Sequence, residues 1–415
     1  MATTAATVTD ICRAAREASR KLASLPTSEK DAALHAIADA LEARTAEILE
    51  ANARDMQAGR ENGLDDALLD RLMLNEERVA AIARQVRDVA ALPDPVGEVI
   101  DGSRLPNGLD VAKVRTPLGV VAVVYEARPN VTIDAAALCL KSGNAIVLRG
   151  SSSAAHSNQV LAQIAAEHAP VEGAVQILTG GDRSELKDLA TQEEYVDLIV
   201  PRGGEGLKKA LSEVATVPVI YAASGNCHVY VDADADLDMA VKITMNAKTQ
   251  RPGVCNAAET LLVHSGIAQE FLPRVLAELR EAGVEIRGDE RVRAIDPTVG
   301  EATEEDFATE FLSLTLAVGV VDSVQEAIDH VNRFGSGHSE AIVTRSYEAA
   351  RAFELGVDAA CVYVNASTRF TDGGEFGFGA EIGNSTQKLH ARGPIGLREL
   401  CSFKYVVRGD GHVRS

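Results

Sequence analysis

The sequence predicts an α/β protein in which parallel sheets are covered by helices on both faces. The first observation is a series of apolar runs rich in β-branched residues, each followed by a turn and a helical pattern, at 120–125, 145–148, 175–178 and 196–200. Strands of a parallel sheet have this pattern because both faces are buried. The second observation is another α/β region, which begins after residue 231 and extends to about 365. This is a nucleotide-binding type of layout, in which ligands lie at the carboxyl ends of the strands.

The composition indicates a folded chain and disfavours several function classes. Of 415 residues, 46% are hydrophobic and 25% are charged, so the chain is neither disordered nor fibrous and has room for about two to three domains. The net charge of −20 disfavours nucleic acid and anionic membranes as partners, and a small anionic substrate would need a local basic pocket. No window reaches the roughly 18 apolar residues of a membrane span, and the start lacks a signal-peptide pattern, so we expect a cytoplasmic protein.

The region 8–91 is expected to form successive helices. One periodic run has Ser28 as its expected N-cap and Glu29 in its first turn, with apolar residues at helical spacing at Leu34, Ile37, Ala38 and Leu41. A second run covers 76–92 and ends at Pro93. We interpret this region as a helical layer that packs on another element.

The region 96–117 predicts a β-hairpin, because Asn107-Gly108 separates two alternating segments. The chain ends with a glycine-rich loop at 373–379 and a closing strand at 397–407. We expect the hairpin and this strand to form a small arm for contact between subunits. Between them, the second α/β region has helical patterns at 238–249, 267–282 and 324–332 and strand patterns at 260–264, 341–344 and 361–365.

Two strand-to-helix turns have residues suited to phosphate groups. Gly203 and Gly204 would let backbone N–H groups approach a pyrophosphate at a helix N-terminus. Arg149 precedes three serines that could hold a terminal phosphate, although the third, Ser153, could instead cap the helix. The G-x-x-x-x-G-K-[ST] loop is absent, which disfavours a phosphate-transferring kinase.

A cysteine is the candidate nucleophile. The six cysteines are scattered, with no C-x-x-C pair and no histidine at metal-ligand spacing, so we expect no disulfide framework and no metal site. Cys255 follows a helix and a Pro-Gly break, and the nearby cations Lys248 and Arg251 favour its thiolate. Cys227 is the rival because His228 adjoins it, but neighbours on an extended segment point to opposite faces. The remaining cysteines are interpreted as packing residues: Cys12, Cys139, Cys361 and Cys401.

Four long stretches carry a family resemblance. They are VYEARPNVTID at 124–134, LKSGNAIVLRG at 140–150, QRPGVCNAAET at 250–260 and GFGAEIGNST at 377–386. They resemble the γ-glutamyl phosphate reductase family of the aldehyde dehydrogenase superfamily, and the resemblance extends from 50–55 to 396–404. It implies an aldehyde dehydrogenase-like fold, with a Rossmann-like parallel-sheet cofactor domain, an α/β catalytic domain and a small oligomerisation arm. The corresponding expected ranges are 1–97 with 115–228, 229–394, and 98–114 with 395–415.

The resemblance also implies the reaction, which is NADPH-dependent reduction of L-glutamyl 5-phosphate to L-glutamate 5-semialdehyde and phosphate in proline synthesis. By position, Cys255 corresponds to the catalytic thiol and Asn130 to the amide of the oxyanion hole. Glu310 corresponds to the carboxylate at the nicotinamide ribose, and Phe376 lies in a loop that resembles the family's late Phe-Gly motif. The expected cofactor residues are Arg149, Ser151, Ser152, Gly203, Gly204, Glu310 and Phe378. The implied partners are further copies of the chain and, functionally, glutamate 5-kinase.

One departure from the wider superfamily bears on the reaction. Aldehyde-oxidising members carry a glutamate that activates water to hydrolyse a thioester, whereas the corresponding stretch here, 223–226, is ASGN and has no carboxylate. A hydrolytic NAD(P)-dependent aldehyde dehydrogenase is therefore the alternative, and a nucleotide-binding scaffold without turnover is a third hypothesis. The candidate cations for the substrate's phosphate and carboxylate are Arg128, Lys248, Arg251 and Arg369.

Overall fold

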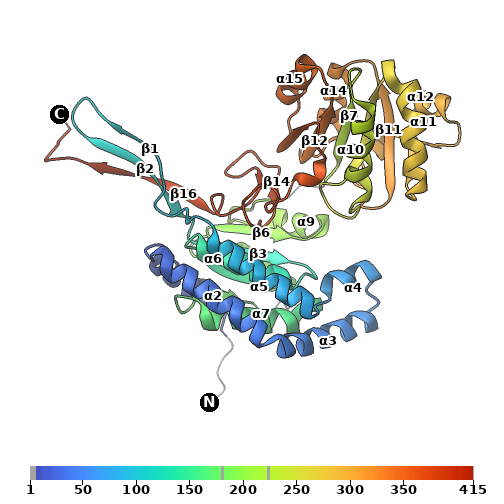
Figure 1. Ribbon diagram of the computed structural model, residues 1–415. Coiled ribbons are helices and arrows are strands. Elements are labelled where there is room, and N and C mark those ends of the chain that lie inside the picture. Colours follow the sequence, from blue (N-terminus) through green and yellow to red (C-terminus); the bar gives the residue numbers. More distant parts are fainter. Residues whose placement is uncertain (1–5, 179–181, 222–224, 415) are drawn as a thin grey trace. The chain divides into compact units, whose positions relative to one another are not determined.

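The computed structural model describes residues 6–178, 182–221 and 225–414 (Figure 1). The chain forms two compact units. Unit 1 consists of Met1–Tyr221, Gly377–Gly383 and Pro394–Ser415, and unit 2 consists of Ala222–Phe376 and Asn384–Gly393. The contacts therefore divide the chain near residue 221, whereas the sequence suggested 228/229, a position that falls inside strand β7 (Cys227–Val231).

Unit 1 contains a four-stranded parallel sheet in the order β5-β4-β3-β6. Its strands are β3 (Val120–Tyr125), β4 (Ala145–Gly150), β5 (Val175–Ile177) and β6 (Leu198–Arg202), and the helices between and after them are α6 (Asn130–Lys141), α7 (Ala155–His168), α8 (Arg183–Ala190) and α9 (Glu205–Val214). The four predicted strands are confirmed. β6 begins two residues later than expected because the Val196 N–H donates to the Gln192 carbonyl in a turn, and pairing with β3 begins at Leu198.

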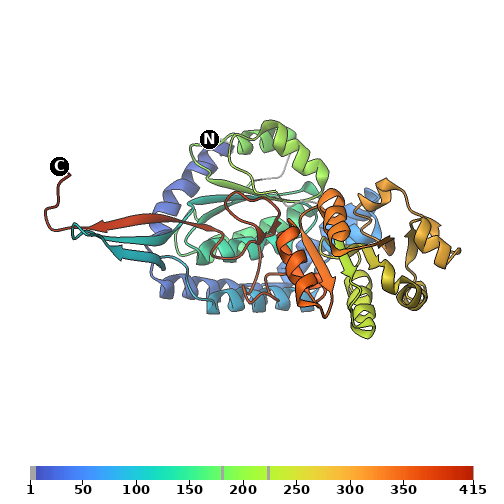
Figure 2. The ribbon, with the colours of Figure 1, turned by 90° about the horizontal axis from the view of Figure 1, so that it is seen from above.

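Five helices precede this sheet, as the sequence predicts: α1 (Val8–Leu22), α2 (Thr27–Ala43), α3 (Thr45–Glu61), α4 (Asp66–Leu72) and α5 (Glu76–Ala91). α2 and α5 pack on each other and on α6, which packs on the sheet, while α1 packs on β4, β5 and α8 (Figures 1 and 2). The prediction of Ser28 as an N-cap is wrong. α2 begins at Thr27 with Pro26 as its N-cap, so Ser28 already lies within the first turn.

The predicted hairpin and closing strand form a separate antiparallel sheet of unit 1, in the order β1-β2-β16. Its strands are β1 (Val99–Arg104), β2 (Asp110–Pro117) and β16 (Cys401–Arg408). Large apolar side chains along these strands are exposed to solvent, among them Val99, Phe403, Tyr405 and Val407. We call this three-stranded sheet the arm.

Unit 2 contains a seven-stranded sheet in the order β10-β9-β11-β8-β7-β12-β13, and every pair of neighbours is parallel. Besides β7, its strands are β8 (Ala258–His264), β9 (Glu285–Gly288), β10 (Gly300–Glu301), β11 (Thr315–Val321), β12 (Ser339–Val343) and β13 (Cys361–Val364). Its helices are α10 (Leu237–Thr249), α11 (Ser265–Glu281), α12 (Glu290–Ile295), α13 (Glu304–Phe307), α14 (Val324–Phe334) and α15 (Tyr347–Gly356). A core of aliphatic residues and Phe271 lies between the sheet and α10 and α11.

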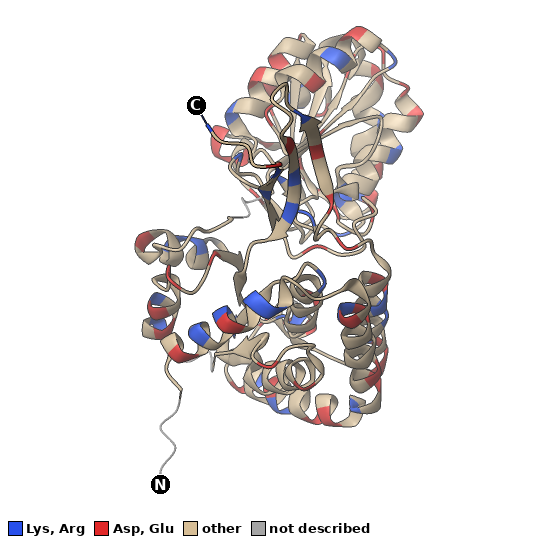
Figure 3. Ribbon diagram, turned by 90° about the vertical axis from the view of Figure 1, so that its left-hand side faces the viewer, with Lys and Arg blue, Asp and Glu red and all other residues tan. Residues whose placement is uncertain are grey.

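The short elements are the 3-10 turns η1 (Ser152–Ala154) and η2 (Thr368–Phe370) and the paired strands β14 (Asn384–Ser385) and β15 (Gly393–Pro394). Acidic and basic residues are interspersed over the outer helices of each unit (Figure 3). Within the described residues, none of the helices combines the length and the apolar character needed to cross a bilayer.

Candidate active site

Cys255 lies in the turn between α10 and β8. Of the six cysteines, all of which the structure describes, five are buried and Cys255 is exposed. The Gly225 backbone packs directly on this turn, because a Cβ added to Gly225 would lie 1.7 Å from the Cys255 carbonyl oxygen. Cys227 lies beneath it and its thiol donates to the same carbonyl at 3.2 Å. Burial, reinforced by the Glu340 charge, raises the pKa of Cys227 well above its ordinary value, so Cys227 stays a neutral donor.

The residue after Cys255 is tied to η2. The side-chain amide of Asn256 donates to the Thr371 carbonyl at 2.9 Å, and the Thr368 hydroxyl donates to the Asn256 carbonyl at 2.7 Å. Thr371 in turn shares hydrogen bonds with the hydroxyls of Ser339 and Tyr363. These buried contacts fix the turn so that the Cys255 side chain is held at the surface.

Arginine side chains provide positive charge beside the thiol. Burial lowers the pKa of Arg369, the neighbouring Arg251 guanidinium lowers it further, and the Cys255 charge opposes both effects. These couplings place Arg251, Arg369 and Cys255 in one electrostatic environment. They make the surroundings of Cys255 favourable for a thiolate and for an anionic substrate.

The structure contradicts the predicted role of Lys248 as a substrate cation. Its side chain is fully enclosed and paired with Glu259, whose side chain is also fully enclosed. Burial lowers the pKa of Lys248 and raises the pKa of Glu259 to about 7, while their attraction opposes both shifts. Glu259 also accepts the Leu312 N–H at 3.1 Å. Lys248 is therefore a core residue that supports the end of α10.

Glu310 lies close to the turn that holds Cys255. Its carboxylate accepts the Gly225 N–H at 2.6 Å, and Gly225 is the residue that packs on Cys255. The predicted role of Glu310 toward the nicotinamide ribose stays a prediction. Of the stretch 223–226, in which the sequence lacks a carboxylate, residues 223 and 224 lie outside the described residues.

In unit 1, Asn130 is the first residue of α6, in the segment that follows β3. This segment is sharply bent, because Ala127 has a φ of 32° and its N–H donates to the Ser151 hydroxyl at 3.2 Å. The Asn130 amide donates to the Asp134 carboxylate at 2.8 Å, one helical turn later. Burial raises the pKa of Asp134 to about 6, partly offset by this hydrogen bond and by Arg202. Asp134 was not among the site residues predicted from the sequence, although its i+4 spacing from Asn130 is a usable signal.

The predicted phosphate-binding residues lie after β4 and β6. The Arg149 guanidinium donates to the Asp182 carbonyl at 2.8 Å and lies 3.2 Å from the Glu185 carboxylate. The hydroxyls of Ser151 and Ser153 share a hydrogen bond of 2.6 Å, and Ser152 is exposed. Ser153 is not the helix cap that we considered, because α7 begins at Ala155 and makes no cap hydrogen bond with its own N-cap side chain.

The other predicted turn leads into α9. A Cβ on Gly203 would lie 2.7 Å from the Glu126 carboxylate, which accepts the Gly204 N–H at 3.1 Å. Glu126, which the sequence analysis missed, thus places a carboxylate at this helix N-terminus. A Cβ on Gly204 or Gly206 would meet no atom within 4 Å, so the space beside this turn is open. An open turn at a helix N-terminus at the carboxyl end of β6 is a position where dinucleotide pyrophosphates bind, and here a pyrophosphate would have to displace the Glu126 carboxylate from the Gly204 N–H.

The predicted residues therefore separate into two groups. Unit 2 holds Cys255 with Arg251, Arg369 and Glu310 around its turn. Unit 1 holds Asn130 and the cofactor candidates of the β4 and β6 turns at the carboxyl ends of its parallel strands. Arg128 also belongs to unit 1, as does Phe378, which lies against Gly396, whereas Phe376 ends the first segment of unit 2. Among the described residues, no group of three or more His, Cys, Asp or Glu residues is arranged to hold a metal ion.

Comparison with known proteins gives consistent matches. A sequence model of the aldehyde dehydrogenase family matches residues 1–306. The γ-glutamyl phosphate reductase of Thermobifida fusca is 59% identical over 98% of both chains, and that of Moorella thermoacetica is 59% identical over 96% of this chain and 97% of the relative. The crystal structure of the Thermotoga maritima γ-glutamyl phosphate reductase superposes with a TM-score of 0.97 at 49% identity, covering 99% of this chain and 100% of that one. An acetylating aldehyde dehydrogenase from Geobacillus thermoglucosidasius, at 20% identity, has the same fold with a TM-score of 0.70 over 98% of this chain and 97% of its own.

Proposed function

The chain belongs to the aldehyde dehydrogenase family. From its relatives that are named γ-glutamyl phosphate reductase, we infer that it reduces L-glutamyl 5-phosphate to L-glutamate 5-semialdehyde and phosphate, in proline synthesis from glutamate. Family membership also implies a nicotinamide cofactor. The observation that carries the reaction is the single exposed cysteine, held in an anchored turn beside Arg251 and Arg369. The hydrolytic alternative is not favoured, because relatives that are 53–59% identical over nearly the full length are named γ-glutamyl phosphate reductase.

We propose that the Cys255 thiolate attacks the acyl carbon of the acyl phosphate. The carbon–sulfur bond forms as the carbon–oxygen bond to phosphate breaks, and Arg251 stabilises the departing phosphate charge. When bound, a nicotinamide cofactor would supply the hydride that reduces the thioester. The Asn130 amide, oriented by Asp134, is the proposed donor to the developing oxyanion. Collapse of the thiohemiacetal then releases the aldehyde and returns the thiol to Cys255.

NADPH is the proposed form of the cofactor. Arg149, Ser151 and Ser152 would hold the 2′-phosphate and the adenosine ribose, Gly203 and Gly204 the pyrophosphate, and Glu310 and Phe378 the nicotinamide end. The support is chemical: a guanidinium and hydroxyls suit a phosphate, and the turn before α9 is open beside Gly204. The ion pair of Arg149 with Glu185 would have to exchange for the phosphate. Equal rates with NADPH and NADH would contradict this proposal.

Three proposals concern the protein's surroundings. Homo-oligomers would form through the arm, whose apolar side chains are exposed. A cytoplasmic location would keep the exposed Cys255 thiol reduced. A functional association with glutamate 5-kinase would limit the loss of glutamyl phosphate, which is a labile acyl phosphate.

The reverse reaction tests the function directly. NADP reduction by L-glutamate 5-semialdehyde is followed with and without inorganic phosphate, in the wild type and in Cys255→Ala. We expect strict dependence on phosphate and no reduction by Cys255→Ala. Equal rates without phosphate would show that water resolves the thioester and would replace this function by the hydrolytic one. No reduction by the wild type would leave a scaffold role.

A further inference from the structure

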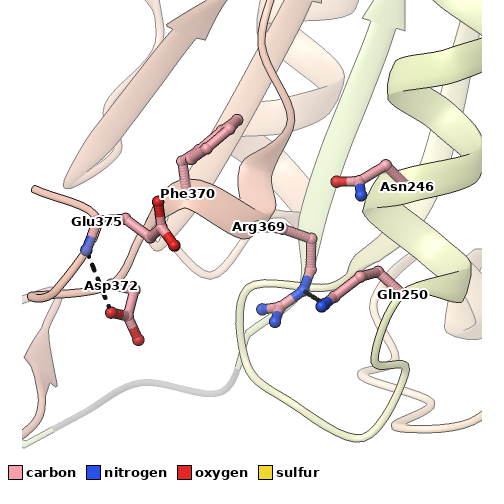
Figure 4. Close-up of a pocket in the computed structure, with 6 residues that line it drawn as sticks. All are labelled: Asn246, Gln250, Arg369, Phe370, Asp372 and Glu375. Carbon is pink, nitrogen blue, oxygen red and sulfur yellow. Dashed lines mark hydrogen bonds between the residues drawn. The ribbon is translucent and has the colours of Figure 1, made fainter.

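A pocket of about 260 Å³ lies entirely within unit 2 (Figure 4). One of its lining residues, Arg369, accepts a hydrogen bond from Asn256, the residue after Cys255. Two of the pocket's residues come from the end of α10 and the residue after it, and the others from η2 and the loop that follows. The lining residues are Asn246, Gln250, Arg369, Phe370, Asp372 and Glu375.

Charges of opposite sign lie on different sides of this pocket. Figure 4 shows Asp372 and Glu375 on one side and Arg369, with Gln250 and Asn246, on the other. The Gln250 side-chain carbonyl accepts the Arg369 Nε–H at 2.8 Å, which orients the guanidinium. One Asp372 oxygen accepts the N–H groups of Gly374 and Glu375 at 2.8 and 3.4 Å, which holds that carboxylate in place. The pocket thus has a negative side and a positive side, and hydrogen bonds hold a charged group in place on each.

The pocket is connected to the nucleophile through short contacts. The Asn256 amide, next to Cys255 in the chain, donates to the carbonyls of Arg369 and Thr371 at 3.4 and 2.9 Å. The charges of Arg369 and Cys255 also interact, as the causes of the Arg369 pKa shift show. The backbone of Arg369 is therefore tied to the residue that follows Cys255, so the pocket that Arg369 lines adjoins the Cys255 turn.

We propose that this pocket binds the α-amino acid end of the substrate. An α-amino acid has a carboxylate and an ammonium group on one carbon, so its ideal site offers a guanidinium on one side and carboxylates on the other. Arg369 binds the α-carboxylate, and Asp372 and Glu375 bind the α-ammonium group. The exposed ring of Phe370 gives the methylene groups of the glutamyl chain an apolar surface. This assignment rests on the proposed function. It gives Arg369 a specific role, which is to bind the α-carboxylate of the substrate.

Substrate analogues separate the two halves of the pocket. The reverse reaction is measured with L-glutamate 5-semialdehyde, with 5-oxopentanoate, which lacks the α-ammonium group, and with 4-aminobutanal, which lacks the α-carboxylate. Because a hydrogen bond to a charged group contributes enough for about a tenfold change, Asp372→Asn and Glu375→Gln should each lower kcat/KM for the semialdehyde about tenfold. The same variants should leave kcat/KM for 5-oxopentanoate unchanged. Arg369→Lys should lower kcat/KM for the two carboxylate-bearing aldehydes and spare 4-aminobutanal.

The ratio between substrates is the decisive readout, because damage to Cys255 would lower all three rates by the same factor. Glu348→Gln, an exposed carboxylate in the first turn of α15, is the matched control and should leave every ratio unchanged. Variants that lower all three rates equally, or none, would overturn the pocket assignment. A wild type that does not reduce NADP with the semialdehyde and phosphate would instead refute the proposed function, so the two failures are distinguishable.

Discussion

At the scale of single residues, the candidate site depends on how closely backbone atoms approach Cys255. The Gly225 backbone occupies space beside the Cys255 carbonyl in which no side chain fits. The Cys227 thiol donates to that carbonyl, and Asn256 anchors the turn from the other direction. The position of Cys255 is thus fixed by contacts that Gly225, Cys227 and Asn256 make with the turn.

Gly225→Ala should therefore abolish most activity. Its Cβ would meet the Cys255 carbonyl oxygen at 1.7 Å, so the turn must shift, and a displacement of about 1 Å can lower a rate about 100-fold. Phosphate-dependent NADP reduction measures the loss, and urea unfolding shows whether the fold survives. Gly206→Ala in α9, whose Cβ would meet nothing within 4 Å, is the matched substitution and should change the free energy of unfolding by no more than about 1 kcal/mol. Full activity in Gly225→Ala would refute this packing argument.

The exposure of Cys255 leads to a second prediction. Iodoacetamide should modify Cys255 in the native protein and abolish activity, because the other five cysteines are buried and burial raises the pKa of four of them: Cys12, Cys139, Cys227 and Cys401. Peptide mass spectrometry identifies the modified residue. Cys255→Ala should remain unmodified over the same time, and modification of Cys227 ahead of Cys255 would reverse the assignment.

At the scale of elements, a carboxylate from one helix caps another. Asp55, buried in α3, accepts the N–H groups of His156 and Ser157 at 3.1 and 2.7 Å and the Ser157 hydroxyl at 2.6 Å. His156 and Ser157 lie in the first turn of α7, whose own N-cap residue is Ala154 and makes no side-chain hydrogen bond. The cap of α7 therefore comes from a residue about 100 positions earlier in the chain, and it fixes α3 against the turn that follows β4.

Asp55→Ala should destabilise unit 1 by about 3 kcal/mol, because it leaves several buried donors without an acceptor. Urea unfolding checks the magnitude, and faster amide hydrogen exchange in α7 checks the location. Asp65→Ala removes an exposed cap that accepts the Leu68 N–H at 2.7 Å and should cost only about 1 kcal/mol. Equal losses of unfolding free energy in the two variants would show that burial of the capping carboxylate adds nothing to stability.

At the scale of the whole molecule, the arm exposes large apolar side chains that a single chain leaves in contact with water. Phe403, Tyr405 and Val407 alternate along β16 and therefore share one face, and Tyr405 and Val407 are 63% and 54% exposed. A three-stranded sheet with an exposed apolar face gains stability when another surface covers it. This arrangement supports the proposed assembly through the arm.

The combined substitutions Tyr405→Asp and Val407→Asp should reduce the molecular mass in solution to that of one chain, since two charges in a buried contact would remain unpaired. Sedimentation equilibrium measures this mass. The pair Ser402→Asp and Lys404→Asp introduces the same side chains on the opposite face of β16 and should leave the assembly intact. A wild type that sediments as a single chain would contradict the proposed role of the arm.

The sequence by itself indicated the four strands of the unit 1 sheet and the hairpin, and it singled out Cys255 as the candidate nucleophile. It did not indicate β11 (Thr315–Val321), a strand inside the sheet of unit 2. Continuous apolar runs are explicit in the chain, which is why β3 begins and ends where predicted and why Asn107-Gly108 correctly predicted the hairpin. Cys255 was identifiable because a Pro-Gly break interrupts the helical pattern before it. The family motifs are continuous stretches of sequence, so the sequence alone indicated the family that the comparisons show.

Only the tertiary structure shows which charged and polar side chains are buried and paired inside the fold. Lys248 and Arg251 are close in sequence, yet Lys248 is enclosed with Glu259 and Arg251 is exposed near Arg369. The cap of α7 by Asp55 likewise joins distant parts of the chain. Sequence periodicity reports which face of an element is apolar, but the partner of a charged side chain depends on three-dimensional proximity, because hydrogen bonds and ion pairs act over only a few ångströms.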